Sequence, residues 1–260
     1  MTARIIAVAN QKGGVGKTTT CVNLAAAFAG MNYPVALLDL DPQGNATTGC
    51  GIDTRKLMVS ACEVLLGERS LQETFLRPKG MNFDLLPSNS DLTAAEVFLL
   101  QQEEREFALK RALEPVLAQY AWIFIDCPPS LNMLTLNALA AADSVLIPMQ
   151  CEYYALEGLT ALLNTIEQIR SAVNPNLAIE GLLRTMYDGR NNLATAVSDQ
   201  LIENFGDLVY RTLVPRNIRV AEAPSYGLPV LLYDPSSKGA LAHLALAGEM
   251  LRRYEKKESA

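Results

Sequence analysis

The sequence has no apolar run long enough to cross a membrane. A spanning helix needs roughly 18 consecutive, mostly apolar residues, and no run in the 260 residues reaches that length, although half of them are apolar. The start, MTARIIAVANQKGG, lacks the form of a signal peptide, because its short apolar run leads directly into a glycine-rich loop. We therefore expect a cytoplasmic protein.

Cysteine and histidine are scarce, and neither is arranged as a metal or redox site. Five cysteines occur, none of them in a C-x-x-C pair, and most stand in apolar surroundings. This spacing indicates small buried hydrophobic residues and no disulfide framework or metal cluster. The single histidine, His243, lies in the helical pattern GALAHLALAGEML, which favours a packed or surface position over a catalytic one.

The chain also lacks a linker rich in proline, glycine or serine, an internal repeat and a low-complexity segment. Because its length is enough to bury a large core, we predict one domain over residues 1–260, with a frayed tail at residues 255–260. The net charge is −6, but three arginines and no acid lie between Val209 and Val220. A local basic patch of this kind can bind a polyanion even on an acidic protein.

Short, continuous apolar runs alternate with helical patterns. The predicted strands lie at residues 4–10, 34–43, 82–88, 122–130, 144–150, 178–188 and 208–216, with a short extended piece at 228–234. The predicted helices lie at 17–32, 61–67, 70–75, 93–120 with a break near residues 103–105, 132–142, 155–173, 192–206 and 238–257. Strands that are apolar on both sides indicate the α/β class, with a mostly parallel, twisted sheet and helices on both faces.

The stretch NQKGGVGKTTT, residues 10–20, follows the first predicted strand and opens the first predicted helix. This context is typical of a phosphate-binding loop and predicts a P-loop NTPase. Backbone N–H groups in a glycine-rich loop converge on phosphate oxygens, and the helix adds its positive end. The residues expected to bind the nucleotide are Lys12, Gly13, Gly14, Val15, Gly16, Lys17, Thr18 and Thr19.

The loop departs from the usual pattern G-x-x-x-x-G-K-[ST]. Gln11 stands where the first glycine is expected, and a second lysine, Lys12, lies just inside the loop. Lys17 is expected to bridge the β- and γ-phosphates and Thr18 to bind Mg²⁺. Thr19 and Thr20 are expected either to contact the outer phosphates or only to cap the helix.

Three aspartates stand at the ends of apolar strands. Asp39 and Asp41 end the run LLDLD, and Asp126 ends WIFID. An aspartate at a strand end is often only a turn residue. Ligands of open α/β sheets gather at the carboxyl ends of the strands, however, and three acids beside a phosphate loop favour a shared magnesium site, made by Thr18, Asp41 and Asp126.

Several motifs together resemble the ParA/Soj family of chromosome- and plasmid-partitioning ATPases, in the deviant Walker A group of P-loop proteins. They are KGGVGKTTT, DLDPQGNAT, DCPPSLNMLTLNAL, PMQCEYYALEGL and VPRNIRVAEAPSYGLPVLLYDPSSKGA. The resemblance runs from the first strand to the final helix. The phosphate loop alone would point only to the wider group, which includes MinD and the nitrogenase iron protein.

The resemblance implies an ATP-bound homodimer in which Lys12, the signature lysine, reaches the nucleotide of the other subunit. There it can neutralise charge on the γ-phosphate, as an arginine finger does. Asp41 matches the acid that positions the attacking water, and Asp39 supports the magnesium site. The implied catalytic residues are Lys12, Lys17, Asp39 and Asp41, and the implied base pocket is made by Pro215 and Asn217, with Met186 as a weaker candidate.

The resemblance further implies slow ATP hydrolysis, with non-specific binding of the ATP dimer to double-stranded DNA of the nucleoid. A ParB/Spo0J-type partner then releases the dimer by stimulating hydrolysis. Binding to DNA phosphates rises with the number of cationic contacts and falls with salt. The residues expected to make these contacts are Arg190, Arg216 and Arg219, with Arg211 and Lys238 as weaker candidates.

Other interpretations stay open at this point. One alternative to DNA binding is that the arginines are solvated or pair with acids such as Asp188 and Glu222. Another is that Arg216 serves the nucleotide pocket. The first alternative function is a MinD-like, membrane-associated ATPase of division-site placement, which needs a C-terminal amphipathic helix that the tail after Tyr254 does not offer. An iron–sulfur protein lacks suitably placed cysteines, and a metabolic kinase lacks a visible acceptor pocket. Without an N-terminal helix-turn-helix segment, sequence-specific repression is not expected.

Overall fold

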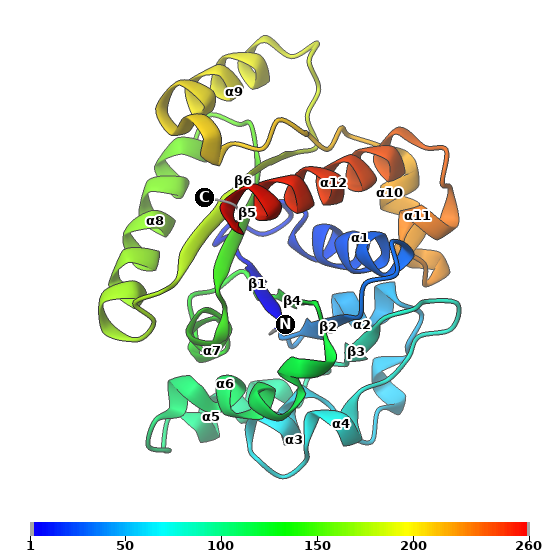
Figure 1. Cartoon of the computed structure of the whole chain (residues 1–260), viewed down its shortest axis with the longest axis vertical. Coiled ribbons are helices and arrows are strands. Elements are labelled where there is room, and N and C mark those ends of the chain that lie inside the picture. Colours follow the sequence, from blue (N-terminus) through cyan, green and yellow to red (C-terminus); the bar gives the residue numbers. More distant parts are fainter. Residues whose placement is uncertain (1–2, 259–260) are drawn as a thin grey trace.

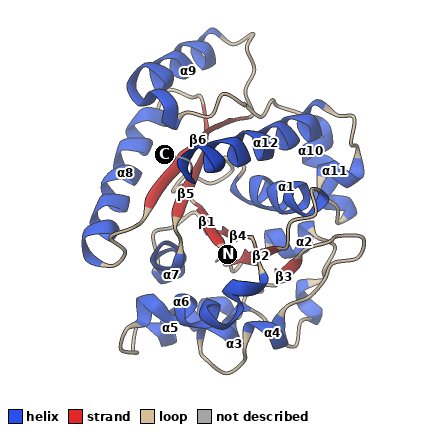
Figure 2. Cartoon of the chain, viewed as in Figure 1, coloured by secondary structure: helices blue, strands red, loops and turns tan. Residues whose placement is uncertain are grey.

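The computed structural model describes residues 3–258, which form a central β-sheet covered by helices on both faces (Figures 1 and 2). The strands are β1 (Arg4–Val8), β2 (Val35–Asp39), β3 (Asp84–Leu86), β4 (Trp122–Asp126), β5 (Ser144–Gln150) and β6 (Ala178–Thr185). They lie in the order β3-β2-β4-β1-β5-β6, and all neighbours are parallel. The predicted α/β class with a parallel sheet is confirmed.

The α-helices connect the strands and extend over the carboxyl-terminal third of the chain. They are α1 (Lys17–Gly30), α2 (Asn45–Gly49), α3 (Ala61–Leu65), α4 (Leu71–Thr74), α5 (Leu92–Leu99), α6 (Ala108–Leu113), α7 (Met133–Ala141), α8 (Ala155–Ala172), α9 (Asn192–Phe205), α10 (Ile218–Glu222), α11 (Val230–Tyr233) and α12 (Lys238–Glu258). Short 3₁₀ helices are η1 (Thr54–Lys56), η2 (Arg105–Phe107), η3 (Glu114–Gln119), η4 (Gly206–Leu208) and η5 (Ala223–Tyr226).

The sheet separates two apolar cores, because successive residues of a strand point to opposite faces. In β1, Ile6 and Val8 pack on the face covered by α1 and α12, which run side by side in Figure 1. Ile5 and Ala7 pack on the other face, with α7, α8 and the smaller helices α3, α5 and α6. Burial on both faces explains why the strands are continuous apolar runs.

Residues 93–120 form several short elements, α5, η2, α6 and η3, and no single helix. The first interruption falls at residues 100–104, where Glu104 has a positive φ of 50°. The predicted break near residues 103–105 is therefore confirmed.

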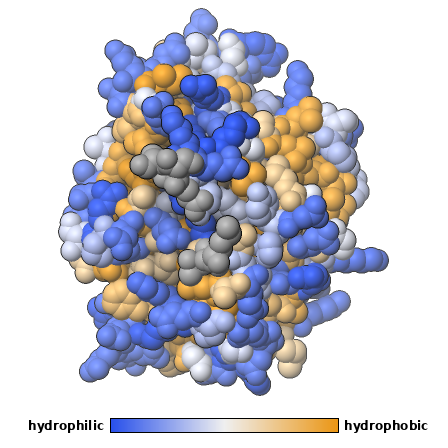
Figure 3. Space-filling view, viewed as in Figure 1, coloured by the Kyte–Doolittle hydropathy of each residue, from blue (hydrophilic) through white to orange (hydrophobic). Residues whose placement is uncertain are grey.

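Polar and apolar side chains are interspersed over the molecular face shown in Figure 3. No helix within residues 3–258 is both long and apolar enough to cross a membrane.

The strand predicted at residues 208–216 is wrong. The segment forms only isolated bridges with β6 and the residues after it, from Val209 to Leu182 and from Pro215 to Tyr187. The N–H groups of Tyr210 and Val214 also donate to backbone carbonyls of β6, but no continuous ladder forms. Its apolar, β-branched composition favours a strand locally, but a strand also needs a neighbour that takes its backbone groups.

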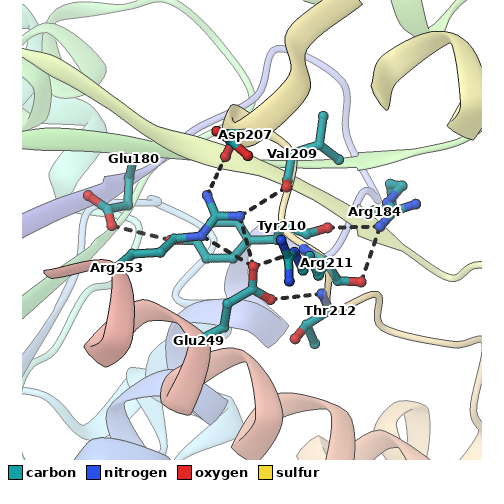
Figure 4. Close-up of polar contacts among 9 residues, drawn as sticks. All are labelled: Glu180, Arg184, Asp207, Val209, Tyr210, Arg211, Thr212, Glu249 and Arg253. Carbon is teal, nitrogen blue, oxygen red and sulfur yellow. Dashed lines mark hydrogen bonds and ion pairs between the residues drawn. The ribbon is translucent and has the colours of Figure 1, made fainter. Parts of the chain in front are cut away.

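Side chains of β6 and α12 bind many of the other backbone groups of this region (Figure 4). Glu249 and Arg184 are more than nine-tenths buried, and Arg253 pairs with Glu249 at 2.8 Å. Charged groups make stronger hydrogen bonds than neutral ones, so the segment stays irregular. The contacts run from the N–H groups of Arg211 and Thr212 to Glu249 (2.9 and 2.8 Å), from Arg253 to the carbonyls of Asp207 and Val209 (2.8 and 2.9 Å), and from Arg184 to the carbonyls of Tyr210 and Arg211 (2.8 and 3.2 Å).

The extended piece predicted at residues 228–234 is also wrong, because residues 230–233 form the helix α11. Pro229 precedes its first residue, and the N–H of Val230 donates to Oδ1 of Asn23 on α1 at 2.8 Å. A partner from a distant helix thus satisfies an N–H group that the helix itself leaves free.

Near the carboxyl terminus of the chain, α12 continues to Glu258. Residues 255–258 of the predicted frayed tail are therefore helical, and residues 259–260 lie outside the described part.

The cysteines lie in the interior, as predicted, and His243 takes the packed position of the two that the sequence left open. All five cysteines are free and buried. His243 is fully buried, and its Nδ1 lies 2.8 Å from the carbonyl oxygen of Gly239 one turn earlier. Burial lowers the pKa of His243 to about 4, so the ring is neutral at physiological pH.

Candidate functional site

The phosphate loop joins the end of β1 to the start of α1, at the carboxyl edge of the sheet. Gly14 and Gly16 have φ values of 74° and 89°, a left-handed conformation that glycine adopts without strain. Gly16 is the cap of α1, and no side chain occupies that cap. The N–H groups of the first helical turn are therefore available to an anion.

Residues at the ends of β5 and β6 hold this loop in place. The hydroxyl of Thr185 lies 2.8 Å from the carbonyl oxygen of Val15 and 3.1 Å from that of Met149. The amide of Gln150 donates to the carbonyl of Gly14 at 3.1 Å, and the amide of Asn10 donates to the carbonyl of Pro148 at 2.8 Å. Local sequence patterns could not predict these contacts, because most of them join residues more than 130 positions apart.

The two lysines of the loop occupy different environments. Lys17 is only 7% exposed, and its ammonium donates to the carbonyl of Lys12 at 3.2 Å. Burial lowers the pKa of Lys17, and the negative charge of Asp126 opposes that shift. Lys12 is exposed and pairs with Glu152, whose side chain is half exposed. Glu152 was not predicted, although it lies in the quoted motif PMQCEYYALEGL.

Asp39 and Asp126 end neighbouring strands directly opposite each other in the ladder between β2 and β4. Both are fully buried, and Phe124, two residues before Asp126, packs on the face that carries α1. Burial raises the pKa of Asp126 well above its ordinary value, and the neighbouring Asp39 raises it further. The predicted acids therefore lie together beside the phosphate loop.

Asp39 is a positioning residue for the segment that follows β2. Its carboxylate accepts hydrogen bonds from the N–H and the hydroxyl of Thr47, at 2.8 and 2.7 Å, and from the N–H of Asp41 at 3.1 Å. Thr47 in turn accepts from the N–H of Ser88, whose hydroxyl donates to the carbonyl of Asp41. Burial raises the pKa of Asp39 to about 6, against these hydrogen bonds. Thr47 lies in the quoted motif DLDPQGNAT and Ser88 ends the strand predicted at residues 82–88, but nothing in the sequence pointed to these contacts.

The donor set fits a magnesium ion that is completed by a nucleotide. Within the described residues, neither carboxylate oxygen of Asp126 has a hydrogen-bond partner of ordinary geometry, although Thr18 lies close enough to favour the ionised form. An unpartnered, buried carboxylate is costly unless a cation approaches it. No group of three or more Asp, Glu, His or Cys side chains among residues 3–258 could hold a metal by itself. Mg²⁺ commonly takes one or two protein ligands together with phosphates and water.

Replacing Asp126 with asparagine is expected to stabilise the nucleotide-free protein at pH 7, which should appear as a rise in Tm. The native carboxyl has a raised pKa, so its burial costs stability once the pH exceeds that of the unfolded carboxyl, and the neutral amide avoids the cost. The gain should vanish as the pH falls toward the ordinary carboxyl range. Thermal unfolding between pH 4 and 8 measures it, and the same variant should lose stabilisation by Mg²⁺ and ATP. An unchanged Tm at pH 7 would contradict the unpartnered state of Asp126.

Of the residues predicted to hold the base, Met186 lies beside the loop. Tyr187 pairs with Pro215, so Met186 and Pro215 lie on adjacent segments. Gln150 connects Met186 to the loop, since its amide lies 2.9 Å from the sulfur of Met186 and 3.1 Å from the carbonyl of Gly14. Asn217 caps α10 through its side-chain oxygen, which accepts from the N–H of Val220 at 3.2 Å. These positions are compatible with a base pocket, and the assignment stays a prediction.

The three arginines predicted to contact DNA are exposed. Arg190 forms a two-point ion pair with Asp188, at 2.9 and 2.7 Å, which holds the pKa of Asp188 at about 2. Arg216 lies next to this loop, because its N–H donates to the carbonyl of Tyr187. The third one, Arg219 on α10, pairs with Glu222 and Asp234. The pairing with nearby acids that the sequence left open is therefore present for two of the three.

Comparisons with known proteins agree with the fold. A family model described as an AAA domain matches residues 3–179. The chain is 51% identical to the chromosome partitioning protein ParA of Myxococcus xanthus, over 96% of this chain and 88% of that protein. It is 49% identical to the sporulation initiation inhibitor protein Soj of Bacillus subtilis, over 95% of this chain and 98% of that one.

A solved structure gives the same result. The structure of cobyrinic acid a,c-diamide synthase from Mycobacterium smegmatis, with bound ATP analog and magnesium, has a TM-score of 0.85 and 40% identity, and the match covers 97% of this chain and 96% of that one. A relative of the same fold thus binds a triphosphate analogue and magnesium together.

Proposed function

The chain belongs to the ParA/Soj family of chromosome-partitioning ATPases, and from this membership we propose that it is an ATP-driven switch for DNA segregation. In the proposed cycle an ATP-bound dimer binds DNA without sequence preference, and a ParB-type partner releases it by stimulating hydrolysis. The observation that carries the proposal is that a buried Lys17 and a buried Asp126, whose carboxylate oxygens have no hydrogen-bond partner among the described residues, both lie at the phosphate loop. The buried positive charge of Lys17 and the buried negative charge of Asp126 are both compensated only when phosphate and a cation bind together.

The ATP dimer is supported by the position of Lys12. Its side chain and that of Glu152 are about half exposed, at 53% and 50%, and an exposed ion pair of this kind contributes about 1 kcal/mol or less. Lys12 can therefore exchange Glu152 for the γ-phosphate of a nucleotide held by a second copy at little cost. This exchange would make dimerisation depend on ATP.

In the proposed hydrolysis step Asp41 orients the attacking water. Lys17 and the loop N–H groups bind the phosphates, and Lys12 of the second copy stabilises the charge that develops on them. Thr18 and Asp126 would hold Mg²⁺, which neutralises phosphate charge when bound. Asp39 acts through Thr47 and Asp41 by fixing the backbone between β2 and α2.

DNA binding by this switch should depend on the nucleotide. The chain with ATP and Mg²⁺ should bind random-sequence duplex DNA, with an affinity that falls steeply between about 50 and 200 mM salt, because each phosphate contact releases counterions. With ADP the binding should be at least ~10-fold weaker, since a monomer offers half of the contacts. Fluorescence anisotropy across a salt series measures both, and equal affinity in the two states would refute the switch.

Single alanine variants of Arg190 and Arg219 separate the DNA interface from the rest of the surface. Each should weaken binding to all sequences alike and reduce the salt slope by about 1 for each phosphate that the arginine neutralises. Arg77→Ala is the matched control. Arg77 is an exposed arginine in the segment before β3 and pairs with Asp84, the first residue of that strand, and it is not one of the three arginines predicted to contact DNA. If Arg77→Ala weakens binding as much as the other two, the assigned interface is wrong.

A membrane-associated function of the MinD type is less well supported by α12. Its apolar residues Met250, Leu251 and Tyr254 pack in the core beside α1, and the ring of Tyr254 lies edge-on to Trp122, with centroids 5.6 Å apart. A membrane-binding helix keeps its apolar face free for lipid. Sedimentation with anionic liposomes and ATP tests the alternative, and binding there without binding to DNA would favour it.

A further inference from the structure

A cavity of about 770 Å³ lies between β6, the segment 205–212 and the last turns of α12. These parts lie close together where the carboxyl end of α12 passes over β6 (Figure 1). The second and third residues of β6 line the cavity, whereas the phosphate loop lies at the opposite, carboxyl edge of the parallel sheet. The volume is within the range of ~300–1,000 Å³ that is typical of small-molecule sites.

One wall of the cavity, residues 207–212, is held in place by charged side chains (Figure 4). Glu249, which is 7% exposed, accepts hydrogen bonds from two N–H groups of this wall, and Arg253 donates to two of its carbonyls. Because the wall is already ordered, a ligand would bind it without the entropic cost of ordering a loop.

Four bases and three acids line the cavity, and some of them neutralise each other. Glu249 pairs with Arg253 at 2.8 Å, and Glu180 pairs with Arg4, outside the cavity, at 2.6 Å. The guanidinium of Arg253 also lies over the ring of Tyr210, 4.0 Å from its centroid. Arg253 and the two glutamates are therefore engaged within the protein and are not free to bind a ligand.

The other three bases of the cavity are unpaired. Arg211, Arg252 and Lys256 are exposed, and within residues 3–256 none of them forms an ion pair or a side-chain hydrogen bond. Arg252 and Lys256 are four positions apart on α12, so their side chains lie on the same face of the helix. Arg211 belongs to the fixed wall. Free cations from two elements thus line one cavity.

Only one acid of the cavity, Asp207, lacks an ion pair among the described residues. Glu203 on α9 and Glu255 on α12 are close to the cavity along the chain but do not line it. Three unpaired bases against one unpaired acid leave the cavity with two excess positive charges. An anion with two negative charges is the complement of such a site.

Apolar side chains complete the cavity. Leu208 is 37% exposed, and Ile179 and Phe205 are partly buried against the core. An inorganic ion would leave this apolar surface in water, whereas an apolar or aromatic body would cover it. A phosphate monoester carries about two negative charges at pH 7, and guanidinium groups bind phosphate through paired hydrogen bonds.

We propose that this cavity binds a small phosphate monoester with an apolar or aromatic body. Arg211, Arg252 and Lys256 hold the phosphate, and Leu208 and its apolar neighbours cover the body. The inference does not depend on the proposed function, because the cavity lies at the edge of the sheet away from the nucleotide site.

The cavity is also separate from the arginines that are predicted to contact DNA. Helix α10, which carries Arg219, packs on Gly239 at the start of α12, where a Cβ atom would meet Val220. Arg252 follows Gly239 by 13 positions on the same helix, which corresponds to ~20 Å at 1.5 Å per residue. A single phosphate group cannot bridge the two places.

The test uses 1-naphthyl phosphate as the probe and isothermal titration calorimetry as the measurement. The wild-type chain should bind it with a Kd of about 1 mM or lower. In the double variant Arg252→Ala, Lys256→Ala the affinity should fall at least ~10-fold, because two cations of the phosphate site are lost. Alanine is the best helix former, so α12 should stay intact. The variant Arg69→Ala, Lys79→Ala is the matched control, since it removes the same charge from two exposed bases outside the cavity.

Two related probes separate the contributions of charge and apolar body. Inorganic phosphate lacks the body and 1-naphthol lacks the charge, so each should bind at least ~10-fold more weakly than the ester. Equal affinity for the ester and for inorganic phosphate would overturn the role of the apolar wall. Equal affinity for the ester and for 1-naphthol would overturn the role of the three cations.

The variant Lys17→Met checks that the probe does not occupy the phosphate loop. It should bind 1-naphthyl phosphate like the wild-type chain. Loss of the probe from Lys17→Met, with normal binding by Arg252→Ala, Lys256→Ala, would place the ester in the nucleotide site and overturn the proposal. Absence of binding to the wild-type chain would overturn it directly, while the proposed function would stand.

Two larger ligands carry phosphate as well and need their own measurements. The Arg252→Ala, Lys256→Ala variant should bind duplex DNA in the presence of ATP with wild-type affinity, and a loss comparable to that of Arg190→Ala would assign the cavity to DNA. Neither the wild-type chain nor this variant should sediment with vesicles that contain phosphatidic acid. Sedimentation of the wild-type chain alone would assign the cavity to a lipid headgroup, and either assignment would overturn the small ligand.

Discussion

Replacing Lys17 with alanine is expected to weaken ATP binding at least ~100-fold, which corresponds to about 2.8 kcal/mol. Lys17 is the buried cation of the loop, and its ammonium donates a hydrogen bond to the carbonyl of Lys12 in the same loop. Phosphate oxygens would replace that carbonyl as acceptors, and a charge-assisted hydrogen bond in a buried site is strong. Titration with a fluorescent ATP analogue in the presence of Mg²⁺ measures the change.

The same substitution also removes from Asp126 a cation that favours its ionised form, so the fold of the variant needs a separate check by circular dichroism. Lys17→Met keeps the length of the apolar stem and controls for lost packing. Lys110→Ala on α6 removes an exposed lysine elsewhere and should bind ATP normally. Retained ATP affinity in a folded Lys17→Ala or Lys17→Met variant would show that the nucleotide binds elsewhere.

The substitution Asp41→Ala is expected to reduce ATP turnover at least ~100-fold while ATP binding and dimerisation persist. Within the described residues, the side chain of Asp41 accepts only from the N–H of Gln43, at 3.0 Å. Its backbone carbonyl, which the variant keeps, is held by the hydroxyl of Ser88 and the N–H of Gly44, both at 2.8 Å. The segment should therefore stay in place without the carboxylate.

Phosphate release under single-turnover conditions measures the chemical step, and gel filtration with ATP measures the dimer. Asp39→Ala is the informative contrast, because it removes the acceptor of Thr47 and Asp41. The Asp39→Ala variant should lose the fixed backbone between β2 and α2 as well as turnover. If Asp41→Ala hydrolyses ATP at the wild-type rate, Asp41 does not position the attacking water.

The parts of the site that follow from short sequence patterns could be predicted. A glycine loop between a strand and a helix, and acids at strand ends, are local features, and the parallel sheet brings them to one edge. Thr185 and Gln150 could not be predicted as anchors of the loop, because they lie 170 and 136 positions after the residues that they bind. The same holds for the pairing of Lys12 with Glu152.

The two errors in the fold have one physical cause. Residues 208–216 and 230–233 carry apolar, partly β-branched side chains, which favour extended backbone locally. In both places a distant polar side chain satisfies the backbone instead, Glu249 in the first segment and Asn23 in the second. Tertiary hydrogen bonds of buried polar groups outweigh a propensity difference of at most ~1 kcal/mol.

The register of the ladder restricts how this chain can change in length. Asp126 pairs with Asp39 on one side and with Val8 on the other, and side chains of a strand alternate between the two faces. Loss or gain of one residue within β4 would turn the carboxylate away from the phosphate loop. Insertions and deletions inside β1, β2 and β4 should therefore be selected against more strongly than substitutions, whereas an exposed turn such as that at Lys79 and Gly80 can vary in length. Chimeras between this chain and its relatives are best joined at such turns.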